Sequence, residues 1–211
     1  MKKQIKIKQN NMLPEGYLNW SMYSLFRSSP EAWYKRYILK EEGFKNKYME
    51  FGGKMALLRE GKEKTEDEII RSVLIFLPQY PNREYELTAP IKIAKKPVIL
   101  LGTVDGVDFR RHIVADDKTG LKGNWTQKIV DNAKQLTWYS MIYLLMKGRL
   151  PNLELNWIET EVVNSKVVAT GNIKTFTTTR TLKDIVLLRS DVNKVWIEMQ
   201  KMCDNKWKEV L

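Results

Sequence analysis

The stretch LGTVDGVDFRRHIVADDKTG, residues Leu101–Gly120, decides the predicted fold because it places polar residues at the ends of two apolar runs. Asp105 closes the first run, and Gly106 after it predicts a tight turn. Asp116 and Lys118 close the second run. In a hairpin of two adjacent strands, Asp105 and Asp116 lie side by side, with Lys118 on the same strand face as Asp116.

Ordinary polar turns are the simpler explanation for Asp105-Gly106 and for Asp117-Lys118-Thr119-Gly120. The pattern D-x-K is also very common by itself. Its context favours a site, because one apolar strand ends in G-x-x-D and the next ends in D-x-K-T-G. Two carboxylates and a lysine at one sheet edge suit a hard divalent cation and an activated water. This arrangement indicates phosphodiester hydrolysis.

The composition favours an intracellular protein with an anionic partner. The 211 residues are 43% hydrophobic and carry a formal charge of +11, which favours nucleic acid first and an acidic membrane surface second. Cys203 is the one cysteine, so an intramolecular disulfide and a cysteine-ligated zinc or iron–sulfur site are excluded. The N-terminal MKKQIKIKQNN lacks an apolar signal region, and no window has the length of a membrane span.

The order of predicted elements is helices, three strands, a helix, two strands and a helix. The N-terminal part holds a basic arm or edge strand over 1–18, helices from Ser21 to about Arg27 and from Pro30, and helical segments around Met55–Glu60 and from Thr65 to about Phe76. The middle part holds strands over 84–93, 98–104 and 109–115 and then a long helix over 124–146. The C-terminal part holds strands over 153–163 and 167–178, with a turn near Asn164-Ser165 or Gly171, and a helix from Leu182 to about Val210.

We therefore expect a single α/β domain: a mixed sheet of about five strands, helices on both faces, and the site where two central strands diverge. An N-terminal helical part over 1–80 precedes a catalytic core over 84–150, and C-terminal strands and a helix occupy 151–211.

The same residues resemble a known family. GTVDGVDFRRHIVADDKTG resembles the core of the PD-(D/E)XK nuclease superfamily in its RecB-like branch, whose pattern G-x-x-D … D-x-K-T is followed by a helix with Q-x-x-x-Y. Gln135 and Tyr139 in QLTWY fit that helix. WSMYSLFRSSPEAWYKRY resembles the S-x-S-x-L … C-P-x-x-W/Y helix, and FGGKMALLRE resembles the F-G-x-x-x-H helix. The resemblance spans roughly residues 19–140 and implies a restriction-endonuclease-like α/β core.

Two positions depart from the family pattern. The histidine of the F-G-x-x-x-H helix is Ala56 here, and its role would fall to Glu60 one helical turn later, to Glu86 on the preceding strand, or to no residue. The cysteine before the proline is Ser29, so the iron–sulfur cluster of some relatives is not expected.

The resemblance implies a mechanism. Asp105 and Asp116, with the carbonyl of Asp117, would hold one or two Mg²⁺ ions, for which Mn²⁺ can substitute, since every ligand is oxygen. Lys118 would orient the attacking water or balance transition-state charge.

The implied function is a metal-dependent deoxyribonuclease of recombination, repair or phage DNA metabolism, in the cytoplasm of a bacterial cell or a phage-infected host. Exonuclease and endonuclease action both stay open, as do a homo-oligomer and a recombination partner protein. A decayed nuclease fold that only binds nucleic acid and an RNA endonuclease are the alternatives.

Further polar and aromatic residues near this core have more than one possible role. Gln135 and Tyr139 share a helix face and form either a buried amide–hydroxyl pair or a contact to substrate phosphate near Lys118. His112 is the single histidine and is more typical of a core or rim position than of a general base. The candidates for backbone phosphate contacts are Lys122, Lys128 and Lys134, and Trp125 is a core residue or a base-stacking one.

Overall fold

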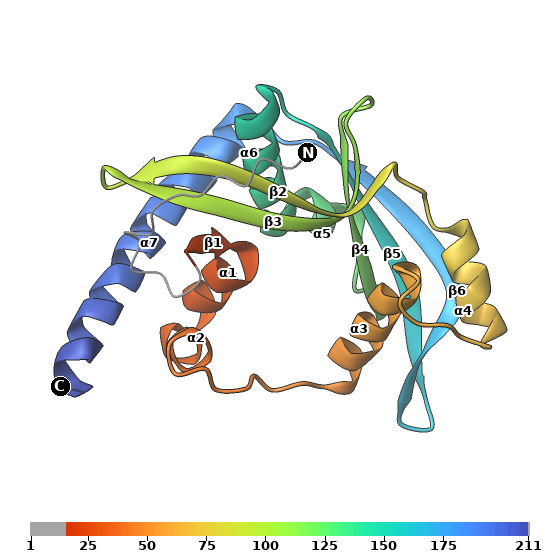
Figure 1. Cartoon of the computed structure of the whole chain (residues 1–211). Coiled ribbons are helices and arrows are strands. Elements are labelled where there is room, and N and C mark those ends of the chain that lie inside the picture. The colour runs from red at the N-terminus through yellow and green to blue at the C-terminus, as the bar shows by residue number, and fades with distance from the viewer. Residues whose placement is uncertain (1–15, 211) are drawn as a thin grey trace.

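The computed structural model describes residues 16–210, whose strands form one six-stranded mixed sheet (Figure 1). The N-terminal part holds β1 (Tyr17–Asn19), α1 (Trp20–Ser28), α2 (Pro30–Tyr37), α3 (Lys47–Arg59) and α4 (Glu68–Phe76). The middle holds β2 (Asn82–Ile93), β3 (Lys96–Asp108), β4 (Ile113–Leu121), α5 (Gln127–Asp131) and α6 (Lys134–Lys147). The chain continues through β5 (Asn152–Val163), β6 (Lys166–Thr178) and α7 (Leu182–Val210). The predicted α/β class is confirmed, and the element order differs from the prediction by the short strand β1 and by two helices, α5 and α6, in place of one.

The strand β3 is the centre of the sheet, because it pairs with three other strands. β2 pairs with it in antiparallel fashion along one edge, from Asn82↔Val107 to Ile93↔Lys96. The other edge is divided between β1, parallel over 99–101, and β4, antiparallel over 106–108. β4 then pairs with β5 in parallel and β5 with β6 in antiparallel fashion. All three predicted segments of the chain thus contribute to one sheet.

The main hydrophobic core lies between β2, β3 and helices α1, α6 and α7. The strand β2 buries alternate residues, Leu87, Ala89, Ile91 and Ile93, as its alternating pattern predicts. The helix α6 is buried continuously from Leu136 to Tyr143. This burial is expected, because the second half of the predicted helix over 124–146 is apolar almost all round.

The helix start predicted at Ser29-Pro30 is confirmed, because the Ser29 hydroxyl accepts the Ala32 amide at 3.2 Å. Two other starts differ: α1 begins at Trp20 after the cap Asn19 rather than at Ser21, and α4 begins at Glu68 after Asp67, whose carboxylate accepts the Ile70 amide at 3.0 Å, rather than at Thr65. Helix α3 begins at Lys47, earlier than the predicted segment around Met55–Glu60. The β5–β6 turn lies at Asn164-Ser165, where both residues have positive φ.

The predicted turns within the Leu101–Gly120 stretch are wrong. Strand β3 continues through Gly106 to Asp108, and the turn falls at 109–112, where the Asp108 carboxylate accepts the amides of Arg110 and Arg111 at 2.9 and 3.0 Å. Gly106 serves close packing instead, because a Cβ there would lie 2.1 Å from the Tyr80 ring. The third strand therefore begins at 113 rather than 109, and it runs through the predicted turn at 119–120.

The predicted long helix over 124–146 is in fact two helices, α5 and α6, which are separated at Asn132 and Ala133. A buried guanidinium lies at the break. Arg180, which is 6% exposed, donates from Nη2 to the carbonyls of Val130 and Ala133 at 3.0 and 3.1 Å. The same carbonyls also accept main-chain amides, that of Val130 from Ala133 at 3.2 Å and that of Ala133 from Leu136 at 3.1 Å. A residue that follows β6 thus stabilises the end of one helix and the start of the next.

The predicted arm or edge strand over 1–18 lies mostly outside the described residues, of which 17–19 form β1. Within residues 16–210, none of the helices is long and apolar enough to cross a bilayer.

Candidate functional site

The candidate site lies where β3 and β4 diverge, as the sequence predicts. Their pairing ends at Gly106↔Ala115, so Asp105 and Asp116 lie on the two strands just beyond the last pair. The amide of Asp117 donates to Oδ2 of Asp105 at 2.5 Å, which closes the fork. The structure therefore brings Asp105 and the D-x-K element together.

Lys118 lies on the same face of β4 as Asp116. Its Nζ is 2.6 Å from Oδ2 of Asp116. Burial alone would lower the pKa of the Lys118 ammonium, but the charge of Asp116 and the hydrogen bond to it, with Asp105 and Asp117, raise that pKa above its usual value. Lys118 is therefore a cation at neutral pH, held against one site carboxylate.

Helix α6 supplies a second contact to Asp116. The Gln135 amide donates to the Tyr139 hydroxyl at 2.6 Å, and that hydroxyl donates to Oδ1 of Asp116 at 3.5 Å. Tyr139 fits so closely above β3 that a Cβ at Gly102 would lie 2.9 Å from its ring. Burial, and then the charge of Asp116, raise the pKa of Tyr139, so it stays a neutral donor. Gln135 and Tyr139 therefore form a buried amide–hydroxyl pair that contacts Asp116, the carboxylate to which Lys118 is also paired.

The Asp105 carboxyl carries the clearest electrostatic signature of the site. Burial, and then the charges of Asp116 and Asp117, raise its pKa from 3.8 to about 8. Like charges at such short range repel each other, and a cation between them relieves the repulsion. All of these side-chain donors are oxygen atoms, which fits a hard divalent ion.

The described part of the chain contains no group of three or more histidine, cysteine or acidic side chains arranged as a ready metal cage. Asp105 and Asp116 could hold a cation only in an open site, in which water, main-chain carbonyls and substrate oxygens would fill the remaining positions. Magnesium sites that act on phosphates have this character, since Mg²⁺ keeps several waters.

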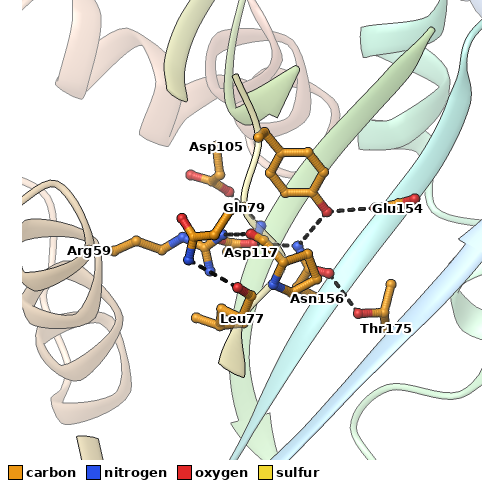
Figure 2. Close-up of polar contacts among 10 residues, drawn as sticks. Arg59, Leu77, Gln79, Asp105, Asp117, Glu154, Asn156 and Thr175 are labelled. Carbon is orange, nitrogen blue, oxygen red and sulfur yellow. Dashed lines mark hydrogen bonds and ion pairs between the residues drawn. The ribbon is translucent and has the colours of Figure 1, made fainter. Parts of the chain in front are cut away.

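Asp117 points to the opposite face of β4 from Asp116, because successive residues of a strand alternate. Its Oδ2 lies 2.9 Å from Nε of Arg59 in α3, and its Oδ1 accepts the Asn156 amide at 2.8 Å (Figure 2). Helices α3 and α6 therefore cover opposite faces of the sheet at the fork. Arg59 and Asn156 were not expected at the site, because a helix and a strand far apart in sequence bring them there.

The glutamate beside Asp105 is Glu84, and the expectation for Glu86 is wrong. The register of the β2–β3 hairpin places Glu84 opposite Asp105, whereas Glu86 is opposite Thr103 and exposed. Burial, and then the charge of Glu60, raise the pKa of Glu84, which also hydrogen bonds Asp105. Glu84 has a φ of 45° inside a strand, a strained conformation for a residue with a side chain.

Glu60 lies near Glu84, but it does not line the cavity between α3 and β4 that Glu84 and Asp105 border. It caps the C-terminal end of α3 and forms an ion pair with Lys62. Ala56, which stands at the family's histidine position, lines the cavity one helical turn earlier. The charge of Glu60 still reaches Glu84, whose pKa it raises.

The fork borders a hollow on each face of the sheet. A cavity of about 440 Å³ lies between α3 and β4, and it is lined by Glu84, Asp105, Asp117 and Lys118 among others. A groove of about 600 Å³ lies on the α6 side and is lined by Asp116, Gln135, Trp20, Trp125, Lys128 and Lys134 among others. Lys128 and Lys134 are therefore brought beside the site, while Lys122 is exposed but does not line either hollow. Trp125 is half-buried against the core at the groove wall.

His112 has a structural role outside the fork. It closes the 109–112 turn with a φ of 55°, and its Nδ1 lies 2.8 Å from the Tyr143 hydroxyl. This is the rim position that the sequence favours over a general base.

Comparison with solved structures shows which known fold this arrangement shares. A protein from Eubacterium rectale with a provisional exonuclease assignment superposes with a TM-score of 0.54 and 11% sequence identity, over 94% of this chain and 85% of that one. This chain therefore shares the fold of a protein described as an exonuclease. A phage-related exonuclease from Haemophilus somnus also matches, with a TM-score of 0.50 and 14% identity, over 88% of this chain and 83% of that one. No family model and no curated protein matches the sequence.

The nuclease-like fold confirms the resemblance stated from the sequence at the level of architecture. At 11% and 14% identity, these neighbours establish the fold alone. The chemistry must therefore be argued from the residues at the fork.

Proposed function

We propose that this protein is a metal-dependent nuclease that hydrolyses phosphodiester bonds of DNA, in recombination, repair or phage DNA metabolism in the cytoplasm of a bacterial or phage-infected cell. The observation that carries the proposal is the fork itself: Asp105 and Asp116 lie where β3 and β4 diverge, with Lys118 2.6 Å from Asp116. The raised pKa of Asp105 supports it, because a carboxyl crowded by like charges is a poor structural element and a good cation ligand.

Asp105, Asp116 and the main-chain carbonyl of Asp117 would hold one or two Mg²⁺ or Mn²⁺ ions, with Glu84 beside them. A bound ion of this kind polarises a phosphate oxygen and lowers the pKa of water. Other side chains of the protein would supply transition-state charge and hold the ligands in place. Lys118 places a positive charge where negative charge develops on the phosphoryl oxygens. Tyr139, held by Gln135, orients the Asp116 carboxylate.

The groove on the α6 side is the proposed path of the nucleic acid. Lys128 and Lys134 on its wall offer phosphate contacts, and Trp125 offers a surface on which a base can stack. Lys122, at the turn after β4, is a further candidate for a backbone contact. Both structural neighbours are described as exonucleases, which favours removal of nucleotides from an end over internal cleavage.

One assay separates the candidate functions. The pure protein is incubated with end-labelled linear DNA, closed circular DNA and a matched RNA, each with Mg²⁺, Mn²⁺ or EDTA. Shortening of linear DNA alone indicates an exonuclease, whereas cutting of circles indicates an endonuclease. RNA cleavage without DNA cleavage supports the RNA endonuclease. Binding without cleavage in any metal supports the decayed nuclease fold.

Replacement of Glu84 tests the third carboxylate of the site, with Glu86 as a matched control on the same strand. Glu84→Gln is expected to weaken Mn²⁺ binding and slow cleavage by about 10- to 100-fold, because groups that support metal ligands typically have effects of this size. Glu86→Gln, which is exposed and opposite Thr103, should match the wild type. Calorimetry with Mn²⁺ and single-turnover cleavage measure both effects. Equal behaviour of the two variants would remove Glu84 from the site.

The charge of +11 predicts a strong salt dependence of DNA binding. The logarithm of the association constant should fall linearly with the logarithm of salt concentration, with a slope of about −0.9 for each phosphate that the protein neutralises. The paired change Lys128→Ala and Lys134→Ala should lower the magnitude of that slope by about 2. Fluorescence anisotropy over a salt series measures it. A flat response would exclude DNA as an electrostatic partner.

A further inference from the structure

A buried ion pair between Arg59 of α3 and Asp117 lies on the α3 side of β4, the strand that carries the D-x-K element (Figure 2). The Arg59 side chain is 6% exposed and the Asp117 side chain 12% exposed, with Nε and Oδ2 2.9 Å apart. Burial lowers the pKa of Arg59 and raises that of Asp117, although each charge opposes the shift of the other. Burying both charges therefore costs desolvation free energy, which suggests that the pair has a role other than stabilising the fold.

The pair belongs to a network that reaches three other parts of the chain. Asn156 of β5 donates to Oδ1 of Asp117 at 2.8 Å and to the Tyr80 hydroxyl at 3.1 Å. The Tyr80 hydroxyl donates to Glu154 at 2.6 Å, and Thr175 of β6 donates to Oδ1 of Asn156 at 2.8 Å. The Asp117 carboxylate is thus contacted on both oxygens: Oδ1 accepts the hydrogen bond from Asn156, and Oδ2 makes the ion contact with Arg59 without hydrogen-bond geometry.

Arg59 is held in the same way from the other side. Its Nη2 donates to the carbonyl of Pro78 at 2.7 Å, in the segment that leads from α4 into β2. A planar guanidinium with two fixed contacts has little freedom to rotate.

The main chain of Asp117 connects this network to the site. While its side chain is clamped behind β4, its amide donates to Oδ2 of Asp105 at 2.5 Å on the side of the fork. Asp116 and Lys118 are its immediate neighbours in the chain. A shift of the Asp117 peptide would therefore move the hydrogen bond to Asp105 and both neighbouring side chains together.

We propose that Arg59 and Asp117 are positioning residues of the site: their buried ion pair, together with Asn156, fixes the Asp117 peptide, which holds Asp105 beside Asp116 and Lys118. The inference rests on the proposed function, because it concerns how the same carboxylates are held for a cation. It gives the middle residue of the D-x-K element a side-chain role, in addition to the main-chain role expected from the sequence.

Two other roles for the Arg59–Asp117 pair would change cation binding in different ways. If the pair only adjusts local charge, Asp117→Leu should weaken cation binding, Arg59→Met should strengthen it, and the double replacement should leave it unchanged. If the Asp117 carboxylate is itself a ligand, Arg59→Met should likewise strengthen binding, because it frees that carboxylate. Positioning predicts weaker binding in all three variants, since each one releases the clamp.

The decisive variant is the double replacement Arg59→Met with Asp117→Leu. It removes one positive and one negative charge, so the local net charge is unchanged, and it leaves no unpaired buried charge. Exchange of a buried ion pair for apolar residues is often neutral or stabilising, so this protein should fold even where a single variant does not. Calorimetry with Mn²⁺ alone and single-turnover cleavage of DNA are measured for wild type, both single variants and the double variant, at a temperature where circular dichroism shows each to be folded.

We expect the Mn²⁺ dissociation constant to rise by about 10- to 100-fold in the double variant, with cleavage slowed to a similar extent and DNA affinity unchanged. The double variant should be no worse than the poorer single one, because the pair acts as a unit. Arg59→Lys, which keeps the charge and one donor, should recover most of the Mn²⁺ affinity. Thr175→Val, which removes one hydrogen bond to Asn156, should weaken Mn²⁺ binding by about 2- to 5-fold.

Asp191→Asn is the matched control, because Asp191 pairs with Arg27 at 3.4 Å and accepts a hydrogen bond from Tyr23 away from the fork. It should change stability and leave Mn²⁺ binding and cleavage as in the wild type. Wild-type Mn²⁺ affinity in the folded double variant would overturn the positioning role and leave the nuclease proposal standing. A wild type that binds Mn²⁺ without cleaving would overturn the nuclease proposal alone, and a wild type that binds no Mn²⁺ would overturn both.

Discussion

Replacing Asp105 or Asp116 with asparagine is expected to abolish cleavage, with a loss of at least about 10³-fold in the single-turnover rate. Asparagine keeps the size of the side chain and removes the charge on which a hard cation depends. Calorimetry should show the loss of a Mn²⁺ site in each variant, while circular dichroism shows an intact fold. Cleavage at the wild-type rate by either variant would refute the metal-site assignment.

Asp105→Asn should also stabilise the metal-free protein, in a pH-dependent way. The folded-state pKa of Asp105 is raised from 3.8 to about 8, so its favourable contribution is complete below the lower value and is lost as the pH rises to the upper one. Asparagine does not ionise and escapes this loss. In EDTA, the variant should exceed the wild type by on the order of 1–3 kcal/mol above pH 8 and match it near pH 4.

Thermal unfolding at several pH values measures this difference, and saturating Mn²⁺ should reverse its sign by stabilising only the wild type. A variant less stable than the wild type in EDTA at high pH would show that Asp105 is a structural carboxylate. Together with the loss of cleavage, a gain in stability is the behaviour of a residue held for chemistry rather than for folding.

Lys118 is expected to behave differently from the two aspartates. In the proposed scheme it is not a cation ligand, so Lys118→Ala should retain DNA affinity and Mn²⁺ binding. The single-turnover rate should fall by about 10²-fold or more, as it does when a transition-state electrostatic group is removed. Lys118→Arg should be nearly as poor, because the larger guanidinium does not fit a site where Nζ lies 2.6 Å from Asp116.

Single-turnover cleavage measured beside DNA affinity distinguishes this role from simple phosphate positioning. If Lys118→Ala weakens DNA binding and leaves the single-turnover rate unchanged, Lys118 holds the backbone and the hydrolytic role belongs to another residue. Lys122→Ala, an exposed lysine just beyond β4, is a suitable control, since its removal should affect binding alone.

Local pattern in the sequence was sufficient for the class of fold and for the core of the site. Alternating apolar residues predicted β2, and the helix cap at Ser29 predicted where α2 begins. The spacing of Asp105 and Asp116 predicted that they meet, because both follow apolar runs that must pair to bury their faces. These features depend on residues close in the chain, so the sequence carries them directly.

Tertiary contacts decided the residues that complete the site. The turn of the β2–β3 hairpin at Ala94-Lys95 sets the register that places Glu84 opposite Asp105. Both turn residues have positive φ without the glycine or asparagine that marks such turns, so the sequence offered no signal for the register. Arg59 approaches Asp117 from α3, 58 positions earlier in the chain. Contacts of this kind arise only when α3 packs on the sheet, and no periodicity or spacing in a single sequence encodes which buried charges will then meet.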